Sequence, residues 1–564
     1  MKRDNFIIIT TTTESDVDSK NYAGKTRFLK ICLIFLVFCG FLSCNSEPVM
    51  EQVDEPPVST LQLSDDELRV LHQMRSPNNR VCIEEAAQLA IEVADFFESN
   101  TLSTRQLGTA PQRRIGAVDI LRIDKQDITL RTQSDDVQNM SDTLAYIFNF
   151  ENELGFVIVA ADTRVESPML AFVDNGSLGD TIDNPGIMLF LEGVVYYIEQ
   201  SIAEAEHLRD SLLVDILNKI WKYGDTGSVG VDSTDIATRI APPPATGIGD
   251  IDGWHTSIYT STHTSFGAWQ IFERVGPLLP VEWGQDAPFN NSVTVLCGIW
   301  GRAPAGCVAV AIAQIMAYWR HPASIDGRSL NWDILREHTA NPNRYPGVGS
   351  RWLDEMTADG TTFRVQVAHL MRRIGAGVNM DYGCGGSGAA RDAAIGFLRN
   401  HGYSVGSLRN FDLTTVITSL NNRHPVYIRG NSTRTITTTS FLGITLSTRT
   451  TYGGGHAWVV DGYMRRRRPV TVTTTVSRLG LDGHWTSTTT TNTHHETATY
   501  LHNNWGWDGL GSTDSWLGRY HGKNGYYRAG VFNSNQAPAH SSSTRSGTPG
   551  NFQFNIEIIS HIHR

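Results

Sequence analysis

The chain has 564 residues, of which 40% are hydrophobic and 19% are charged, and it contains 51 glycines and 13 tryptophans. This length and composition predict several globular domains with sizeable cores. The formal net charge of −11 argues against a nucleic-acid partner, because nucleic-acid binding favours a basic surface. We interpret the dense basic run Arg465 to Arg468 as a solvated strand end or loop.

Residues 1–44 have the pattern of a bacterial export signal. Basic residues precede a short apolar stretch, too short to span a membrane, which ends just before Cys44. The Leu-Ser-Cys sequence resembles a lipobox and predicts a lipoprotein-type signal peptide, with Cys44 as a lipid-modified anchor on the periplasmic or cell-surface face. An ordinary cleaved signal, in which Cys44 has no role, is the alternative. Residues 45–64 are expected to be a tether.

Residues 65–225 are predicted to form an α+β domain. Apolar residues at helical spacing predict helices at residues 83–97 and 188–202. Two apolar runs on either side of a Glu-Asn-Glu turn predict a β-hairpin at residues 143–161. The segment that follows, residues 226–262, is rich in Gly, Asp, Ser and Pro, and it is predicted to be an exposed linker that is open to proteolytic cleavage.

Residues 263–564 are predicted to form a second α+β domain. Its first part shows helical periodicity at residues 308–319 and 363–374. Its later part is rich in Thr, which favours strands, and predicts an extended antiparallel sheet. A disordered Thr-rich insertion is the alternative for this later part.

Four cysteines lie beyond the leader: Cys82, Cys297, Cys307 and Cys384. None forms a CxxC pair, and their spacing does not resemble a disulfide framework or a zinc site. Cys307 lies in the first turn of a predicted helix, where the helix dipole favours a thiolate, the nucleophile of acyl transfer. Taken alone, this position leaves a buried structural cysteine equally open.

His456 joins a glycine-rich loop to an apolar strand, 149 residues after Cys307 (456 − 307), a spacing found in papain-like enzymes. A lone histidine is more often structural, but the glycines and the cysteine favour a general base. Asn504 is a candidate to orient this imidazole, and Trp505 to shield it from water. Gln285 is a candidate to complete an oxyanion hole with the Cys307 backbone N–H.

Taken together, these segments resemble the streptopain family of bacterial cysteine peptidases. The resemblance rests on residues 277–290, 306–322, 380–390, 453–463 and 503–509. The hairpin region, residues 142–176, resembles the family's propeptide. The resemblance implies a papain-like, two-lobed α+β domain, endopeptidase activity, and synthesis as a zymogen inhibited by its own propeptide.

The resemblance also assigns roles to single residues. It makes Cys307 the nucleophile, His456 the general base and Gln285 the oxyanion-hole amide, with Trp505 beside the histidine. It places Ser387 and Gly455 in the substrate cleft, and residues 537–550 in a mobile loop near it. Two features depart from the family: the Thr-rich segments are longer, and Cys297 and Cys384 are extra thiols.

The sequence therefore predicts an exported, lipid-anchored cysteine endopeptidase zymogen that acts on protein or peptide substrates without a metal or organic cofactor. A catalytically silent surface binding protein on the same fold is the alternative. A metallopeptidase is disfavoured, because His494 and His495 do not form an HExxH motif.

Overall fold

The fold is that of a computed structural model. It describes residues 61–73, 78–101, 113–124, 127–132, 143–179, 184–225, 231–232, 256–298, 301–340, 358–441, 444–479, 485–507, 509–510, 519–520, 523–533 and 554–564. The predicted signal peptide with Cys44, nearly all of the tether, most of the predicted linker and the predicted mobile loop lie outside the described residues. None of the helices in these ranges is long and apolar enough to cross a membrane.

The chain divides into two compact units. The larger unit contains residues 71–208, 264–471 and 493–564, and the smaller one contains residues 1–70, 209–263 and 472–492. This division does not follow the predicted domain boundaries, because residues of the predicted propeptide and peptidase share the larger unit. Those boundaries stay predictions, but the predicted linker contains strand β6 (Val231–Asp232) and the start of strand β7 (Thr256–Phe266).

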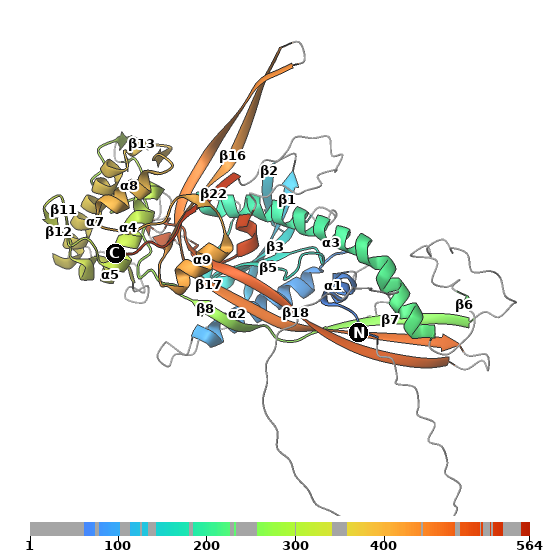
Figure 1. The fold of residues 1–564 in the computed structure, drawn as a ribbon. Helices are drawn as coiled ribbons and strands as arrows, with labels where there is room; N and C mark the ends of the chain where they lie inside the picture. The colour runs from blue at the N-terminus through green and yellow to red at the C-terminus, as the bar shows by residue number, and fades with distance from the viewer. Residues whose placement is uncertain are drawn as a thin grey trace, which may run out of the picture. The chain divides into compact units, whose positions relative to one another are not determined.

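Helices form one lobe of the predicted peptidase domain (Figure 1). They are α4 (Cys307–Trp319), α5 (Trp332–Ala340), α7 (Ala358–Gly377) and α8 (Ala393–Asn400). Helix α4 is apolar on nearly all sides, and its residues from Val308 to Ala317 are buried. A helix that is apolar all round must be enclosed by other elements, and α4 is the centre of this lobe's core.

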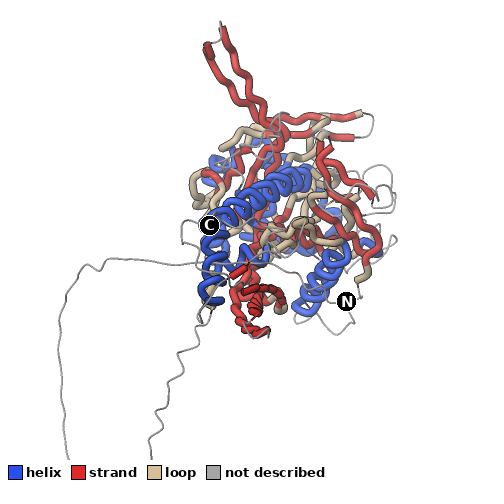
Figure 2. Tube along the Cα trace, turned by 90° about the vertical axis from the view of Figure 1, so that its right-hand side faces the viewer, coloured by secondary structure: helices blue, strands red, loops and turns tan. Residues whose placement is uncertain are grey.

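A large antiparallel sheet forms the other lobe. The strands contributed by the predicted peptidase domain are β8 (Gln270–Val275), β15 (Arg409–Asn410), β16 (Val426–Phe441), β17 (Ile444–Leu479), β18 (Trp485–Asn504), β21 (Gly525–Arg528) and β22 (Phe554–Ile559). Helix α9 (Leu413–Asn421) precedes β16. Strands β16 and β17 continue past the sheet as a long two-stranded ribbon (Figure 1, Figure 2).

The predicted propeptide domain contributes its own strands to this sheet. They are β1 (Ile115–Asp124), β2 (Asp127–Thr132), β3 (Ala145–Phe150), β4 (Phe156–Ala160) and β5 (Met169–Val173). Strand β5 pairs with β21, so the order runs β15-β22-β16-β17-β18-β21-β5-β4-β3-β1-β2. The helices of this part are α1 (Asp65–Gln73), α2 (Ile83–Thr101) and α3 (Pro185–Asp225).

Short elements complete the described chain. They are β6 (Val231–Asp232), β9 (Leu296–Cys297), β10 (Gly301–Arg302), β11 (Ser324–Ile325), β12 (Arg328–Ser329), β13 (Asp381–Gly383), β14 (Gly386–Gly388), β19 (Gly509–Leu510), β20 (Arg519–Tyr520) and the 3₁₀ turns Glu151–Glu153 and Ala529–Asn533. The strands among them lie mostly in small hairpins outside the large sheet.

The predicted helices and the hairpin are confirmed, although α3 is longer than its periodicity indicated. Asn184 and Pro185 explain where α3 begins: the Asn184 side chain accepts the N–H groups of Gly186 and Ile187, and proline suits the first helical position. The Thr-rich segments form strands of β16, β17 and β18, so the predicted antiparallel sheet is confirmed over the disordered alternative. In β17 and β18, hydroxyls pair across the strands, as at Thr473 and Thr491.

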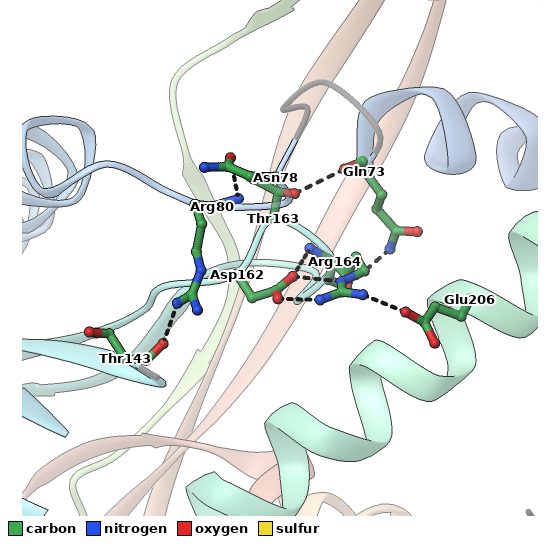
Figure 3. A network of polar contacts seen from close by, with 8 residues as sticks. All are labelled: Gln73, Asn78, Arg80, Thr143, Asp162, Thr163, Arg164 and Glu206. Carbon is green, nitrogen blue, oxygen red and sulfur yellow. Dashed lines mark hydrogen bonds and ion pairs between the residues drawn. The ribbon is translucent and has the colours of Figure 1, made fainter. Parts of the chain in front are cut away.

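A polar network joins the parts of the predicted propeptide domain (Figure 3). Arg164 binds the carboxylate of Asp162 through two nitrogens and also pairs with Glu206 of α3. Beside it, the Thr163 hydroxyl donates to the carbonyl of Gln73 at the end of α1. These contacts tie the turn after β4 to helices at both ends of this domain.

The interpretation of Arg465 to Arg468 as a solvated run is wrong for two of its members. Side chains alternate between the faces of a strand, so Arg466 and Arg468 of β17 point to the same, inner face. Arg466 is 2% exposed and stacks over the rings of Phe96 and Trp269. Arg468 is also buried, where it pairs with a glutamate of β18. Aromatic faces and one ion pair accommodate the buried charges.

Candidate active site

Cys307 is the first residue of α4, as predicted. The residue before it, Gly306, has φ = 92°, a backbone conformation that side chains rarely adopt. A Cβ atom on Gly306 would lie 2.7 Å from the sulfur of Met380. Glycine is therefore required here, and the turn that it permits presents the Cys307 thiol at the positive end of the helix.

Burial dominates the electrostatics of the Cys307 thiol in this structure. It raises the pKa of the thiol above its usual value, against the effect of backbone hydrogen bonds at Ala457, Val308 and Cys307 itself and of the positive charge of Arg429. This differs from the expectation that the helix start favours a thiolate, because the loss of solvent outweighs the helix dipole. Ala457 directly follows His456 in the sequence, so the hydrogen bond with its backbone places the thiol beside the strand that carries His456.

His456 is held rigidly on β17, opposite Gly430 of β16, and it is 3% exposed. Its Nε2 atom lies 2.9 Å from the backbone carbonyl oxygen of Trp505. A carbonyl can only accept, so Nε2 carries the proton and Nδ1 keeps a free lone pair when the ring is neutral. Burial lowers the pKa of His456 to about 4, although the hydrogen bond to Trp505 opposes this effect.

The partner of His456 is therefore a backbone carbonyl and not the amide of Asn504. The Asn504 side chain donates to the carbonyl of Val281 and accepts the N–H of Gly506. Asn504 thus stabilises the turn that contains Trp505. It was predicted to bind His456 directly, but it acts through the backbone of the next residue. The Trp505 ring is fully buried, close to the ring of Trp458, so water is excluded from this side of the imidazole.

The backbone of Gln285 lies close to the start of helix α4, near Cys307. Its carbonyl accepts the N–H of Ala305, two residues before Cys307, and the residue is 7% exposed. The segment that carries it is fixed to α4, because the buried Gln314 side chain accepts the N–H of Trp283. Gln314 was not singled out from the sequence, since its role depends on a segment 31 residues away.

Ser387 and Gly455 also lie near the two predicted catalytic residues. The Ser387 hydroxyl donates to the carbonyl of Pro304 at 2.7 Å, three residues before Cys307. Gly455 precedes His456 on β17 and lies opposite Asn431, whose side-chain oxygen would be 3.1 Å from a Cβ atom at Gly455. Ser387 thus contacts the segment before Cys307, and Gly455 is the neighbour of His456.

Cys297 and Cys384 form a disulfide, which corrects the expectation of two free thiols. Their separation of 87 residues gave no local signal, and only the folded chain brings β9 and the β13–β14 hairpin together. Of the cysteines in the described part of the chain, Cys82 and Cys307 are free. In the same ranges, no group of three or more His, Cys, Asp or Glu side chains is arranged to hold a metal ion.

The first turn of α3 packs directly against this site. A methyl group at Gly186 would overlap the ring of Trp505, whose carbonyl holds His456. One turn further along α3, the Leu189 side chain would contact a Cβ atom placed at Gly430, the strand partner of His456. The predicted propeptide thus contacts the support of the imidazole.

Comparisons with known proteins found two matching families and several similar structures. Residues 283–516 match the model of the Peptidase C10 family, and residues 78–198 match the Spi protease inhibitor family. A fragment of prointerpain A from Prevotella intermedia is 16% identical, with a TM-score of 0.40, and the match covers 79% of this chain and 99% of that one. Active interpain A cysteine protease of the same organism is 19% identical, with a TM-score of 0.27, over 52% and 96%. No curated protein matches the chain.

The two family matches identify a cysteine peptidase that carries its own inhibitor domain. The chain contains a peptidase domain of the C10, or streptopain, family, preceded by a propeptide domain of the Spi protease inhibitor family. The predicted resemblance and the papain-like α+β fold with an N-terminal inhibitor domain are confirmed.

Proposed function

We propose that this protease zymogen is an endopeptidase in which Cys307 and His456 form the catalytic dyad. The observation that carries the proposal is the contact of His456 with the Trp505 carbonyl. It leaves Nδ1 as the basic nitrogen, while the thiol of Cys307 interacts with the backbone of Ala457, the neighbouring residue. A thiol and a base held on separate rigid elements suit nucleophilic catalysis.

In the proposed mechanism, Nδ1 of His456 takes the proton of the Cys307 thiol, and the thiolate attacks the scissile carbonyl. The backbone N–H of Cys307 and the Gln285 amide stabilise the oxyanion. The imidazolium then protonates the leaving amine, and water activated by His456 releases the acyl-enzyme. Ser387 and Gly455 line the substrate cleft in this proposal, and the Trp505 carbonyl orients the base.

The pKa shifts support latency of the precursor. Burial raises the pKa of Cys307 and lowers that of His456 to about 4, so both groups are neutral in this state. A neutral thiol is a poor nucleophile. Cleavage within residues 226–262 and release of the propeptide would restore solvent to the site and allow the thiolate–imidazolium pair to form.

The proposal extends to the location of the protein. The signal pattern before Cys44 supports export and an N-terminal lipid anchor, with the peptidase at the periplasmic or cell-surface face. We also propose that residues 45–64 are a tether, residues 65–225 the inhibitory propeptide and residues 263–564 the peptidase, as the sequence predicted.

The dyad is tested by comparing self-processing of the purified precursor with that of Cys307→Ala. We expect the wild type to shorten to the peptidase domain and to cleave casein. The variant should stay at full length and lose activity by about a thousandfold or more, because acyl transfer loses its nucleophile. Gel electrophoresis and a peptide-hydrolysis assay measure the two effects.

Cys82→Ala is the matched control, because Cys82 is an exposed free cysteine outside the site. It should process and hydrolyse like the wild type. Full activity of Cys307→Ala would exclude the proposed nucleophile. A folded wild-type protein that binds peptides but never cleaves them, even after the linker is cut and the propeptide is removed, would instead favour a silent binding protein.

A further inference from the structure

The Cys297–Cys384 disulfide joins two loops that have little structure of their own. Cys297 ends the two-residue strand β9, and Cys384 lies in the turn of the hairpin β13–β14. Glycines occupy positions 383, 385, 386 and 388 of this hairpin, and Cys384 is exposed. Short, glycine-rich hairpins are only marginally stable in water, because ordering glycine costs much backbone entropy.

Both loops border the approach to Cys307. Strand β10, the partner of β9, leads through residues 303–306 into the first turn of α4. From the other hairpin, the Ser387 hydroxyl donates to the Pro304 carbonyl, and the Ser387 Cβ lies 3.4 Å from the position that a side chain on Gly306 would take. The disulfide is thus a second, covalent link between the two segments.

The loop at Cys297 also carries exposed apolar side chains. Leu296 is 66% exposed and Val295 is 36% exposed, next to the disulfide. The backbone carbonyl of Leu296 lies 3.8 Å from the Cys384 sulfur. Neighbouring exposed apolar side chains on a rim beside a nucleophile suit contact with a bound chain, provided that the rim is held in place.

The dyad itself is supported by other elements. Cys307 begins the buried helix α4, and His456 lies in β17 between β16 and β18. Neither support contains a residue of the disulfide. Loss of the disulfide should therefore loosen the rim and leave the thiol and imidazole where they are.

We propose that the Cys297–Cys384 disulfide is a positioning element of the substrate cleft, which fixes the rim for extended peptide substrates. The proposal rests on Cys307 being the nucleophile. The disulfide acts on substrate binding and not on the reactivity of the dyad. It also gives this peptidase two cysteine requirements of opposite kind: a reduced Cys307 and an oxidised Cys297–Cys384 pair.

The test compares mature wild-type enzyme with Cys297→Ser/Cys384→Ser. We expect kcat/KM for a peptide that spans the cleft to fall by about ten- to a hundredfold, mainly through KM, since the rim no longer positions the chain. The rate of Cys307 alkylation by iodoacetamide should not change, because this small reagent does not use the rim. Thr418→Ser, a substitution on the exposed side of helix α9 in the peptidase part, is the control and should alter neither quantity.

A second measurement does not need the double variant, and it tests the proposal even if that variant fails to fold. Folded wild-type enzyme is titrated with dithiothreitol, which breaks the S–S bond, leaves two cysteine thiols and is itself oxidised to its cyclic disulfide. Mass analysis of maleimide-labelled peptides follows the reduction of the pair. We expect KM for the long peptide to rise in step with this reduction, while the number of alkylatable Cys307 sites stays constant.

Unchanged KM in both the folded variant and the fully reduced wild type would overturn the proposal. Equal losses of peptide hydrolysis and of Cys307 alkylation would also overturn it, since the disulfide would then support the nucleophile itself. Failure of the proposed function has a different signature, namely Cys307→Ala enzyme that stays active with the disulfide intact.

Discussion

At the scale of single residues, a backbone carbonyl decides which nitrogen of His456 can act. The Trp505 carbonyl accepts from Nε2, so Nδ1 is the basic atom. The sequence made Asn504 the expected partner, because an asparagine side chain often orients such an imidazole. The turn at Gly506, where φ is 65°, instead directs a main-chain oxygen to the ring. Every residue has a backbone carbonyl, so the sequence could not indicate that this one binds His456.

Glu192 of α3 is a second residue whose chemistry depends on its surroundings, because burial changes the pKa of its carboxyl group. Burial raises its pKa to about 8, and its Oε2 atom has no hydrogen-bond partner among the described residues. The folded chain keeps this proton up to about pH 8, whereas an unfolded glutamate loses it near pH 4.3. The stability of the precursor should therefore fall as pH rises from about 4 to 8.

We predict that Glu192→Gln stabilises the precursor at alkaline pH. At pH 8 the variant should melt about 2–4 °C higher than the parent, because the neutral amide avoids the cost of a buried charge. Near pH 4 the two should melt together. Thermal unfolding of both chains in the Cys307→Ala background measures the difference without self-digestion.

Glu199→Gln, at an exposed position of the same helix, is the control and should shift the melting temperature little at either pH. The explanation is wrong if the gain from Glu192→Gln is the same at pH 4 and pH 8, since a pH-independent gain would come from packing.

At the scale of elements, the first turn of α3 is where the propeptide contacts Trp505, whose carbonyl binds His456. Periodicity predicted a helix from residue 188, and the structure begins it at Pro185 behind the Asn184 cap. The added turn contains Gly186, which lies against the Trp505 ring. A glycine near a helix start is locally unfavourable, and its reason here is the close approach of the indole.

We predict that Gly186→Ala weakens latency. The methyl group would overlap the Trp505 ring, so α3 must move away from the site. The precursor should then cleave itself several-fold faster than the wild type, although alanine favours the helix by about 1 kcal/mol. The time course of processing, followed by gel electrophoresis, measures the change.

Gly179→Ala is the matched control, because nothing lies within 4 Å of a Cβ atom at that position. Its processing rate should equal that of the wild type. Slower processing of Gly186→Ala would mean that helix propensity outweighs the overlap, and the proposed role of this contact would be lost.

At the scale of the whole molecule, propeptide and peptidase share a sheet and a core. Strand β5 pairs with β21 through residues 171–173 and 525–527. One buried cluster contains Phe190 and Leu189 of α3 together with Trp458 and Trp505 of the peptidase. An interface of this kind resembles a domain interior and should not separate when the linker is cut.

We predict that the two parts stay together after cleavage between residues 233 and 255. Cys307→Ala precursor, nicked there with an added protease, should elute from a sizing column at the position of the intact chain. The fragments should separate in denaturant, because burial of the common core then no longer favours association. Two separate peaks at micromolar concentration without denaturant would contradict this prediction. Activation would accordingly require removal of the propeptide after the cut.

The sequence by itself determined the elements and the chemistry. Apolar periodicity and the glycines predicted α2, α4, α7 and the β3–β4 hairpin, and spacing brought Cys307, His456 and Gln285 into one hypothesis. These signals act within a few residues, so they survive without knowledge of the fold. The family resemblance added the inhibitory role of the first domain.

Only the tertiary structure decided what burial and distant contacts do to these residues. It paired Cys297 with Cys384, enclosed Arg466 in aromatic rings, and gave the Trp505 carbonyl to His456. It also reversed the expected pKa shift of Cys307, because burial outweighs the local helix dipole. Each outcome depends on contacts between segments that are far apart in the sequence. Local sequence patterns do not predict which distant segments come into contact.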